Sequence, residues 1–388
     1  MAAAVYVDVQ PAVLDWVIQR TQFENVSSDV TDKLTKWRDG IKKPTVRQLE
    51  DVSRKTHIPF GYFFLHTPPK EDFDLVEYRT VDSEALLHPS RNLIDIVSAM
   101  AQAQEWFADY CKESGFDPLP FVGRFSNAKG HSGIAEDIRR ELYLAMNWFE
   151  FSRNSSDSFR YLAKRIEECG VMVTRSGVVS GARTLKVSEF RAFTLINAYA
   201  PLIFINSNDT DNAKLFSLLH ELAHVWIGRD SLYNEPHASY DDVSRAEQIC
   251  NAVAAEILVP DELFKAKWQS IGNNGEQKLE TLRKYFKCSR FVIIRKALEN
   301  GFISRGQFTS LNAMLKGQYQ KQLKEKKEKK GGRGNYYSNL IARWSPHFIL
   351  ALAQSTENGR TSYTEAYRLT GTRGSTFDKL AQKVGSGQ

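Results

Sequence analysis

Apolar positions in the first seventy residues recur at the spacing of helices. Val13, Trp16 and Val17 share one helical face, and Leu34 and Trp37 repeat the pattern further along the chain. The threonine at position 45 follows a proline and can cap a third helix, because its side chain can accept a hydrogen bond from the first turn. With the Gly-containing turn between them, these helices predict a small all-helical unit.

The pattern stays helical for another hundred residues and then changes. Amphipathic stretches at 93–111 and 133–149 predict two helices, separated by a Pro- and Gly-rich break. From residue 159 the pattern is mixed. A further helix is expected to end at Gly170, and the apolar run VMVT after it predicts a short strand.

Two longer apolar runs, FRAFTLIN and PLIFINS, are separated only by AYA and predict the two strands of a hairpin. Two helices are expected next, at 214–227 and 242–258, joined by a polar loop. Residues 277–315 are again helical in pattern, interrupted by a glycine at position 301. The prediction is therefore a fold rich in helices with one small cluster of strands.

The clearest chemical signal is the run HELAH at 220–224. His220 and His224 are four residues apart, so on a helix their imidazoles lie on one face and can bind the same metal ion. Glu221 lies beside them, where it can hold a water molecule without binding the metal. The flanking residues are almost all apolar, which predicts a buried helix, and buried imidazoles beside a buried carboxylate are costly unless a metal compensates them.

The helix expected at 242–258 can supply a third ligand. Glu247 and Asn251 are four residues apart and share a face. A catalytic zinc ion is held by three protein ligands and keeps one open position, and His220, His224 and Glu247 satisfy that requirement. Asn251 can orient one imidazole. The alternative is a chance HExxH pattern on an ordinary core helix, just as Cys250 is read either as a buried small residue or as a thiol that senses the metal.

The residues HELAHVWIG, followed by the second helix with its AAEILVP ending, resemble the ImmA/IrrE family of metallopeptidases, a gluzincin-type group. The run FRAFTLINAYAPLIFINS, with Asn206, resembles the segment that precedes the metal helix in that family. The N-terminal stretch from Trp37 to the paired prolines resembles an XRE-like helix-turn-helix unit. The resemblance implies zinc ligands at His220, His224 and Glu247, with Glu221 as the catalytic base. It also implies a helix-turn-helix repressor as substrate.

The predicted fold class is α+β, with a gluzincin-like zinc peptidase domain, an N-terminal all-α helix-turn-helix unit and additional helical segments. The expected cofactor is Zn²⁺, with Mn²⁺ as a substitute in vitro. The expected domains are an XRE-like unit over 1–70, a connecting helical region over 71–150, the peptidase domain over 151–305, and a lysine-rich linker with a C-terminal helical appendage over 306–388.

Hydrolysis needs further groups that the sequence leaves open. Arg191, Tyr199 and His237 are candidates to stabilise the oxyanion, against the plainer readings of an ion pair, a hairpin tip and a loop residue. The strand PLIFINS could bind an extended substrate by strand addition, or could be a plain core strand. The polar loop 228–242 could cover the site.

Net charge is +6, but it is concentrated in one segment. Residues 316–333 carry eight Lys or Arg and two Glu, which is +6, and the remaining 44 basic and 44 acidic residues cancel. A lysine-rich run of this kind is more often a solvated helix end or linker than a nucleic-acid site. Any DNA binding is expected to be weak, dependent on salt and carried partly by this run.

The N-terminal unit gives mixed signals for DNA binding. Residues 1–70 hold ten basic and eight acidic residues, and Asp29 and Asp32 would repel a phosphate backbone. Contact with another helix-turn-helix protein is the alternative role. The residues that could meet phosphates are Lys36, Arg38, Lys42, Lys43, Arg47, Arg54 and Lys55.

Composition bounds the function class. Hydrophobic residues make up 42% and charged residues 25%, which excludes wholesale disorder, and no apolar run is long enough to span a bilayer. With four scattered cysteines and no signal-like start, a cytoplasmic protein with reduced thiols and no membrane partner is expected. The predicted function is limited proteolysis of a protein partner, such as a helix-turn-helix repressor or antitoxin-like regulator encoded nearby. The alternatives are a DNA-binding regulator whose peptidase domain is a sensor or inactive, and a toxin-antitoxin component.

Overall fold

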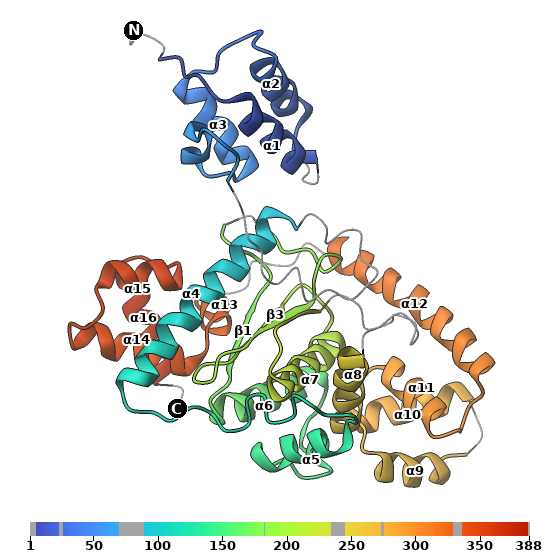
Figure 1. Cartoon of the computed structure of the whole chain (residues 1–388). Coiled ribbons are helices and arrows are strands. Elements are labelled where there is room, and N and C mark those ends of the chain that lie inside the picture. Colours follow the sequence, from blue (N-terminus) through green and yellow to red (C-terminus); the bar gives the residue numbers. More distant parts are fainter. Residues whose placement is uncertain are drawn as a thin grey trace. The chain divides into compact units, whose positions relative to one another are not determined.

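The structure is a computed structural model of the whole chain (Figure 1). It describes residues 5–22, 26–69, 89–181, 183–233, 245–272, 275–328 and 336–386. The chain divides into two compact units, one with the described residues up to 97 and one with those from 98 onward. No helix in the described ranges combines the length and apolar composition needed to cross a membrane.

The first unit is helical, as predicted. It contains α1 (Pro11–Gln22), α2 (Ser28–Arg38), α3 (Val46–Thr56) and the short 3-10 helix η1 (Phe60–Phe64). The predicted cap at Thr45 is confirmed: its hydroxyl accepts a bond from the Gln48 amide at 3.3 Å, and the Gln48 side chain accepts one from the Thr45 amide at 2.9 Å. Apolar residues of α1, α2 and α3 form the core, including Val17, Leu34 and Leu49.

The second unit is mixed, which confirms the α+β class. Its four strands are β1 (Met172–Ser176), β2 (Ala192–Leu195), β3 (Leu202–Asn206) and β4 (Ser231–Tyr233). Helix α4 (Arg91–Glu113) begins in the first unit and continues into the second. The helices that follow are α5 (Ser132–Glu141), η4 (Trp148–Phe151), α6 (Ser155–Glu168), α7 (Asp211–Ile227), α8 (Arg245–Leu258), α9 (Asp261–Ser270), α10 (Gly275–Phe286), α11 (Arg290–Glu299), α12 (Arg305–Glu328), α13 (Tyr336–Arg343), α14 (Pro346–Glu357), α15 (Tyr363–Thr370) and α16 (Ser375–Gly385).

The sheet has the strand order β1-β3-β2-β4. β1 is parallel to β3, while β2 is antiparallel to both β3 and β4. The predicted hairpin of β2 and β3 is therefore confirmed. Strand addition to PLIFINS is wrong, because this segment forms β3 and both of its edges are already paired with β1 and β2.

Two other expectations need correction. The predicted helix 133–149 ends early: α5 stops at Glu141, Tyr143 adopts a positive φ of 51°, and a separate 3-10 helix follows. The polar loop 228–242 is not all loop, because residues 231–233 form β4. Residues 234–242 lie outside the described residues, so their predicted covering role stays a prediction.

Helix α7 is the centre of the second unit. It packs against β2 and β3 on one side and against α6 and α8 on others (Figure 1). Side chains from both sides of the predicted boundary at residue 150 share its core, among them Ile138, Trp148 and Leu162. At the end of the chain, α13 contacts β1, and Phe348 of α14 packs edge-on against Trp106 of α4.

Candidate metal centre and active site

Both ends of α7 are secured by specific contacts. At its start, the Thr210 hydroxyl accepts a hydrogen bond from the Ala213 amide at 3.3 Å. At its end, Gly228 takes a left-handed conformation with φ 76°, and its Cα hydrogens face Gly123, so that a side chain there would collide with the Gly123 backbone. The Gly123 amide also donates to the Val225 carbonyl at 3.0 Å. These contacts fix a helix that is buried nearly all round.

The structure brings His220, His224 and Glu247 together, as the sequence predicted. His220 Nε2 lies 3.0 Å from Glu247 Oε2, His224 Nε2 lies 3.1 Å from Glu247 Oε1, and the two Nε2 atoms are 3.3 Å apart. All three side chains are buried. Two neighbouring helices thus direct three ligand-type atoms at one point.

These distances fit a metal ion. Zinc binds imidazole nitrogen and carboxylate oxygen at about 2.0–2.2 Å, so tetrahedral ligands of one zinc ion lie about 3.3 Å apart. The donor set of two imidazoles and a carboxylate is also one that zinc uses in catalytic sites. The His220–His224–Glu247 cluster can therefore hold a metal ion with little rearrangement.

Electrostatics at the cluster favour a charged carboxylate. Burial raises the pKa of Glu247, but the two imidazoles outweigh burial and hold that pKa below its usual value. Burial lowers the pKa of His224, but the Cys250 thiol and Glu247 beside it raise that pKa well above the usual value. An ionised Glu247 is the form that a metal ion requires of this ligand.

Asn251 lies where the sequence placed it. Its Oδ1 is 3.0 Å from His220 Nδ1, so the amide oxygen can accept the ring proton and present Nε2 to the metal. Cys250, one residue before it, is fully buried in the hydrophobic core, and burial raises the pKa of its thiol. This favours the reading of Cys250 as a small buried residue.

Glu221 is also fully buried, and two hydroxyl groups hold it. Thr194 Oγ1 donates to Glu221 Oε2 at 2.6 Å, and the Ser231 hydroxyl donates to the same oxygen. Thr194 and Ser231 are directly opposite each other on β2 and β4, so their side chains leave the same face of the sheet. Glu221 Oε1 has no hydrogen-bond partner among the described residues. One oxygen of the Glu221 carboxylate is therefore hydrogen-bonded, and the other can still accept a hydrogen bond or a proton.

The structure gives contacts for two of the three oxyanion candidates, Arg191 and Tyr199. The Arg191 guanidinium pairs with Asp209 at 2.5 Å and also donates to the Tyr319 hydroxyl at 2.8 Å. This is the ion pair that the sequence offered as the plainer reading. Tyr199 lies between β2 and β3, with Lys112 Nζ 5.6 Å from its ring centre. His237 lies outside the described residues.

Sequence reasoning missed the two hydroxyl residues. Thr194 lies inside the predicted strand FRAFTLIN, and its alternation with Phe193 did signal that it faces the opposite side of the sheet. Ser231 had no such signal, because β4 has only three residues and follows the metal helix in a polar segment. Only the register of β2 with β4 places the two together.

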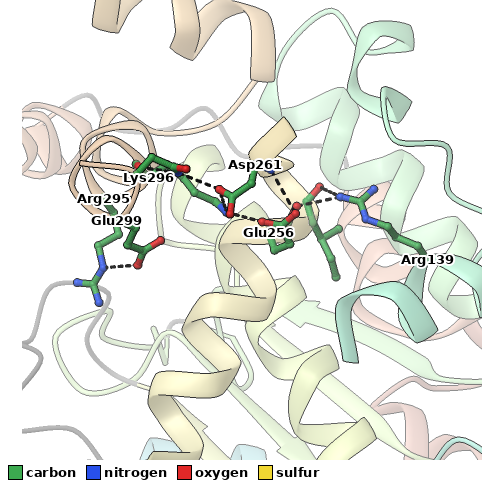
Figure 2. A network of polar contacts seen from close by, with 8 residues as sticks. Arg139, Glu256, Asp261, Arg295, Lys296 and Glu299 are labelled. Carbon is green, nitrogen blue, oxygen red and sulfur yellow. Dashed lines mark hydrogen bonds and ion pairs between the residues drawn. The ribbon is translucent and has the colours of Figure 1, made fainter. Parts of the chain in front are cut away.

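The other end of α8 carries a second polar cluster, which is built around a buried lysine (Figure 2). The Lys296 ammonium, 2% exposed, donates to the Glu256 carboxylate and to Asp261 Oδ1 at 2.9 Å. Arg139 Nη2 donates to the carbonyl of Glu256 at 2.8 Å and to that of Ile257 at 3.1 Å, which satisfies two acceptors at the end of the helix. This network joins α5, α8, α9 and α11.

Comparison with known proteins supports a metallopeptidase. Residues 167–298, which include α7 and α8, match the family model of the IrrE N-terminal-like domain, Peptidase_M78. Residues 344–383 match a domain of unknown function, DUF8813. No solved structure matches the chain.

Two curated relatives are both named radiation response metalloprotease IrrE. The protein from Deinococcus radiodurans is 31% identical over 88 residues, which is 21% of this chain and 26% of the relative. The protein from Deinococcus deserti is 34% identical over 95 residues, which is 22% of this chain and 34% of the relative. The chain therefore matches about a quarter to a third of the length of these relatives. Within that region, the chain is similar to IrrE-type metallopeptidases.

Proposed function

We propose that this protein is a zinc-dependent endopeptidase that cleaves a protein partner at few bonds. The observation that carries the proposal is the buried cluster of His220, His224 and Glu247 next to the buried Glu221. A protein core keeps two imidazoles and two carboxylates together at a cost, and a divalent cation offsets that cost. The similarity of this region to metalloproteases supports the same reaction class.

His220, His224 and Glu247 would hold the metal, and Asn251 would keep the His220 ring in the orientation that presents Nε2. When bound, a zinc ion supplies Lewis-acid chemistry, which acidifies water and polarises a peptide carbonyl. Glu221 Oε1, which is available, takes the proton from the attacking water and then passes it to the leaving amine.

Thr194 and Ser231 have a supporting role in this reaction. Their hydroxyl groups donate to Glu221 Oε2, so that oxygen is the weaker base and the carboxylate cannot rotate freely. Proton transfer is therefore directed to Oε1. These two residues position Glu221 and need not touch the substrate.

The substrate we propose is a protein, and specifically a helix-turn-helix repressor or antitoxin-like regulator encoded nearby. Two features support a selective peptidase. His220 and Glu221 are fully buried, and His224 is 2% exposed, so a substrate must match the surroundings to reach them. Among the described strands, β4 is an edge strand that pairs only with β2, and it carries Ser231 beside Glu221, so an extended peptide could pair along it.

An inactive sensor domain of a DNA-binding regulator is the competing function. It would require the three metal ligands and not the base. Glu221, however, is buried beside the cluster and held by two hydroxyl groups, although metal binding alone requires neither this carboxylate nor its two donors. This arrangement favours catalysis.

The test begins with metal content. The purified protein is expected to hold about one zinc ion per chain, and the double variant His224→Ala/Glu247→Ala is expected to hold none. Equal zinc in both proteins would overturn the ligand assignment.

The second step measures cleavage. The protein is incubated with zinc or manganese and with a helix-turn-helix protein encoded beside its gene, and products are mapped by mass spectrometry. We expect one or two cleaved bonds, no digestion of casein, and no detectable cleavage by Glu221→Gln within the time that the wild type needs to cleave its partner. Broad digestion of casein would refute selective proteolysis, and an intact partner under every metal condition would refute the proposed substrate.

A further inference from the structure

Two short helices close to the end of the chain, α15 and α16, contribute no residue to the His220–His224–Glu247 cluster. α15 and α16 are joined by only four residues, 371–374, and the region 344–383 that matches a domain of unknown function covers α15 and most of α16. Two helices joined by a turn of three or four residues that contains glycine are the signature of a helix-turn-helix. The peptidase site is built without them.

The turn between the two helices is fixed by glycine and by hydroxyl groups. Gly371 ends α15 with φ 66°, and Gly374 precedes α16 with φ 45°, which are conformations that favour glycine. Thr370 and Thr372 are buried, and their hydroxyl oxygens lie 2.7 Å apart. The Thr372 amide also donates to the Tyr367 carbonyl at 3.1 Å. The angle between the helices is therefore set by the turn.

A third helix completes the unit. α14 packs against both α15 and α16, and these helices also contact each other. Ala366 and Leu369 of α15 and Phe377 and Leu380 of α16 are buried, as is Leu352 of α14. Three helices around one small core, with the last two joined by a tight turn, are the arrangement of the helix-turn-helix proteins that read DNA.

The outer face of α16 carries the chemistry that DNA requires. Ser375, Lys379, Gln382 and Lys383 are exposed and recur at helical spacing, and Arg373 is exposed in the turn before them. Three of these side chains are cationic, while Asp378 is the one exposed acidic residue on α16. Lys and Arg bind phosphates and guanine, and Gln can bind adenine.

The N-terminal unit differs from α15 and α16 in the length of its turn. Seven residues, 39–45, separate α2 from α3, which is longer than the turn of a helix-turn-helix, whereas four residues separate α15 from α16. The basic side chains of the N-terminal unit therefore provide a control region of similar charge without this tight turn.

We propose that α15 and α16 form a helix-turn-helix that places α16 in the major groove of double-stranded DNA. Arg373, Lys379 and Lys383 contact phosphates and base edges, and Gln382 reads a base. Lys316 and Lys321, which are exposed at the start of the run 316–333, add attraction that does not depend on sequence. This function is independent of peptide hydrolysis.

The test uses the full-length protein and a fluorescein-labelled 24-base-pair duplex, selected from a randomised library by binding to the wild type. Anisotropy gives the Kd over a range of salt concentrations. The test variant is Arg373→Gln/Lys379→Gln/Lys383→Gln. Its matched control, with the same loss of charge, is Lys42→Gln/Lys43→Gln/Arg47→Gln in the N-terminal unit. Circular dichroism and zinc content verify that each variant is folded.

We expect the α16 variant to bind at least tenfold more weakly, with the slope of log Kd against log salt reduced by about 2 to 3. The N-terminal control should stay within twofold of the wild type. A second variant, Gln382→Ala, should keep the salt slope but change the base preferred at one position of the selected duplex.

Three results would overturn the proposal. One is an α16 variant that binds as the wild type does. Another is equal weakening by the α16 variant and the N-terminal control, since that would indicate attraction by charge alone. The third is a wild-type protein that selects no duplex sequence, or that binds single-stranded RNA or a protein in preference to duplex DNA.

Discussion

Helix α8 carries a buried glutamate near its start and a partly buried one near its end, and the two have different partners. Glu256, near the end, lies against the ammonium of Lys296, a permanent cation supplied by the chain itself. Glu247, near the start, lies between the imidazoles of His220 and His224, whose ring nitrogens are also metal ligands. A carboxylate that is balanced by lysine is a structural element. A carboxylate that faces two imidazoles is one that can be balanced by a metal ion.

The two ends of α8 also differ in how completely their polar groups are paired. At the Glu256 end, donors and acceptors satisfy one another: Asp261 accepts from both Lys296 and Asn300, and Arg139 caps the helix carbonyls (Figure 2). At the Glu247 end, Glu221 keeps one oxygen without a partner among the described residues. The Glu256 end, called the closed end below, holds α8 in place through its paired groups. The Glu247 end, called the open end below, is where a reaction can occur.

The largest effect is expected from Glu221→Gln, which tests whether the open end is catalytic. Glutamine keeps the shape of the side chain but cannot take a proton, so kcat for cleavage of the partner should fall by about 10² to 10⁴. Zinc content should not change, since Glu221 is not a ligand. A glutamine variant that cleaves normally would contradict the assignment of the base.

The next effect concerns the closed end. Lys296→Met leaves the partly buried Glu256 without its cation and should lower the free energy of unfolding by about 2–4 kcal/mol. The double variant Lys296→Met/Glu256→Met removes both charges and should recover most of that loss. Urea unfolding of the wild type and both variants provides the measurement. If the double variant is as unstable as the single one, the charge pair is not what stabilises this end.

Glu167 offers a third way to neutralise a buried carboxyl group. Burial raises its pKa to about 8, although it accepts hydrogen bonds from the Ser345 hydroxyl at 2.7 Å and from the Val173 amide. In the unfolded chain the pKa is about 4.5, so the folded state retains the proton that the unfolded state loses between these values. Stability should therefore fall as pH rises from about 4.5 to 8 and level off above that.

Glu167→Gln removes this titration and should flatten the dependence of stability on pH. The variant should gain about 2–4 kcal/mol relative to the wild type between pH 5 and pH 8, because a one-unit pKa shift is worth about 1.4 kcal/mol. Thermal or urea unfolding at several pH values measures the difference. A constant difference across this range would show that Glu167 does not bind a proton in the folded state.

The smallest effect is expected for the hydroxyl groups that position Glu221. Thr194→Val and Ser231→Ala each remove one donor to Oε2 and should lower kcat about tenfold, with KM and zinc content little changed. Thr194→Ser keeps the hydroxyl and should restore the rate. A Thr194→Ser variant as slow as Thr194→Val would assign the loss to packing, and not to the hydroxyl group.

The sequence predicted the parts of this molecule that depend on local spacing. The helix containing His220 and His224, the helix containing Glu247, the cap at Thr45 and the hairpin of β2 with β3 all follow from periodicity within short windows. Asn251 beside His220 follows from the same helical geometry once the metal face is known. These features need no knowledge of which elements meet.

Features that depend on strand order or on distant contacts were not predicted. The Tyr319 hydroxyl that binds Arg191 is 128 residues away in sequence, and Lys296 is 40 residues from Glu256. The position of PLIFINS at the centre of the sheet, and not at its edge, depends on β1 and β2 pairing with it on both sides. A hydrophobic pattern identifies a buried strand but does not give its neighbours.

The most direct test of the account is the location of the metal itself. A crystal of the zinc-loaded protein, measured at the zinc absorption edge, gives the position of zinc independently of activity. We predict one strong anomalous peak about 2.0–2.2 Å from His220 Nε2, His224 Nε2 and a carboxylate oxygen of Glu247. The Glu256–Lys296 end of the same helix should show no peak. Zinc bound elsewhere in the chain, or no peak at the His220–His224–Glu247 cluster after loading, would contradict the account.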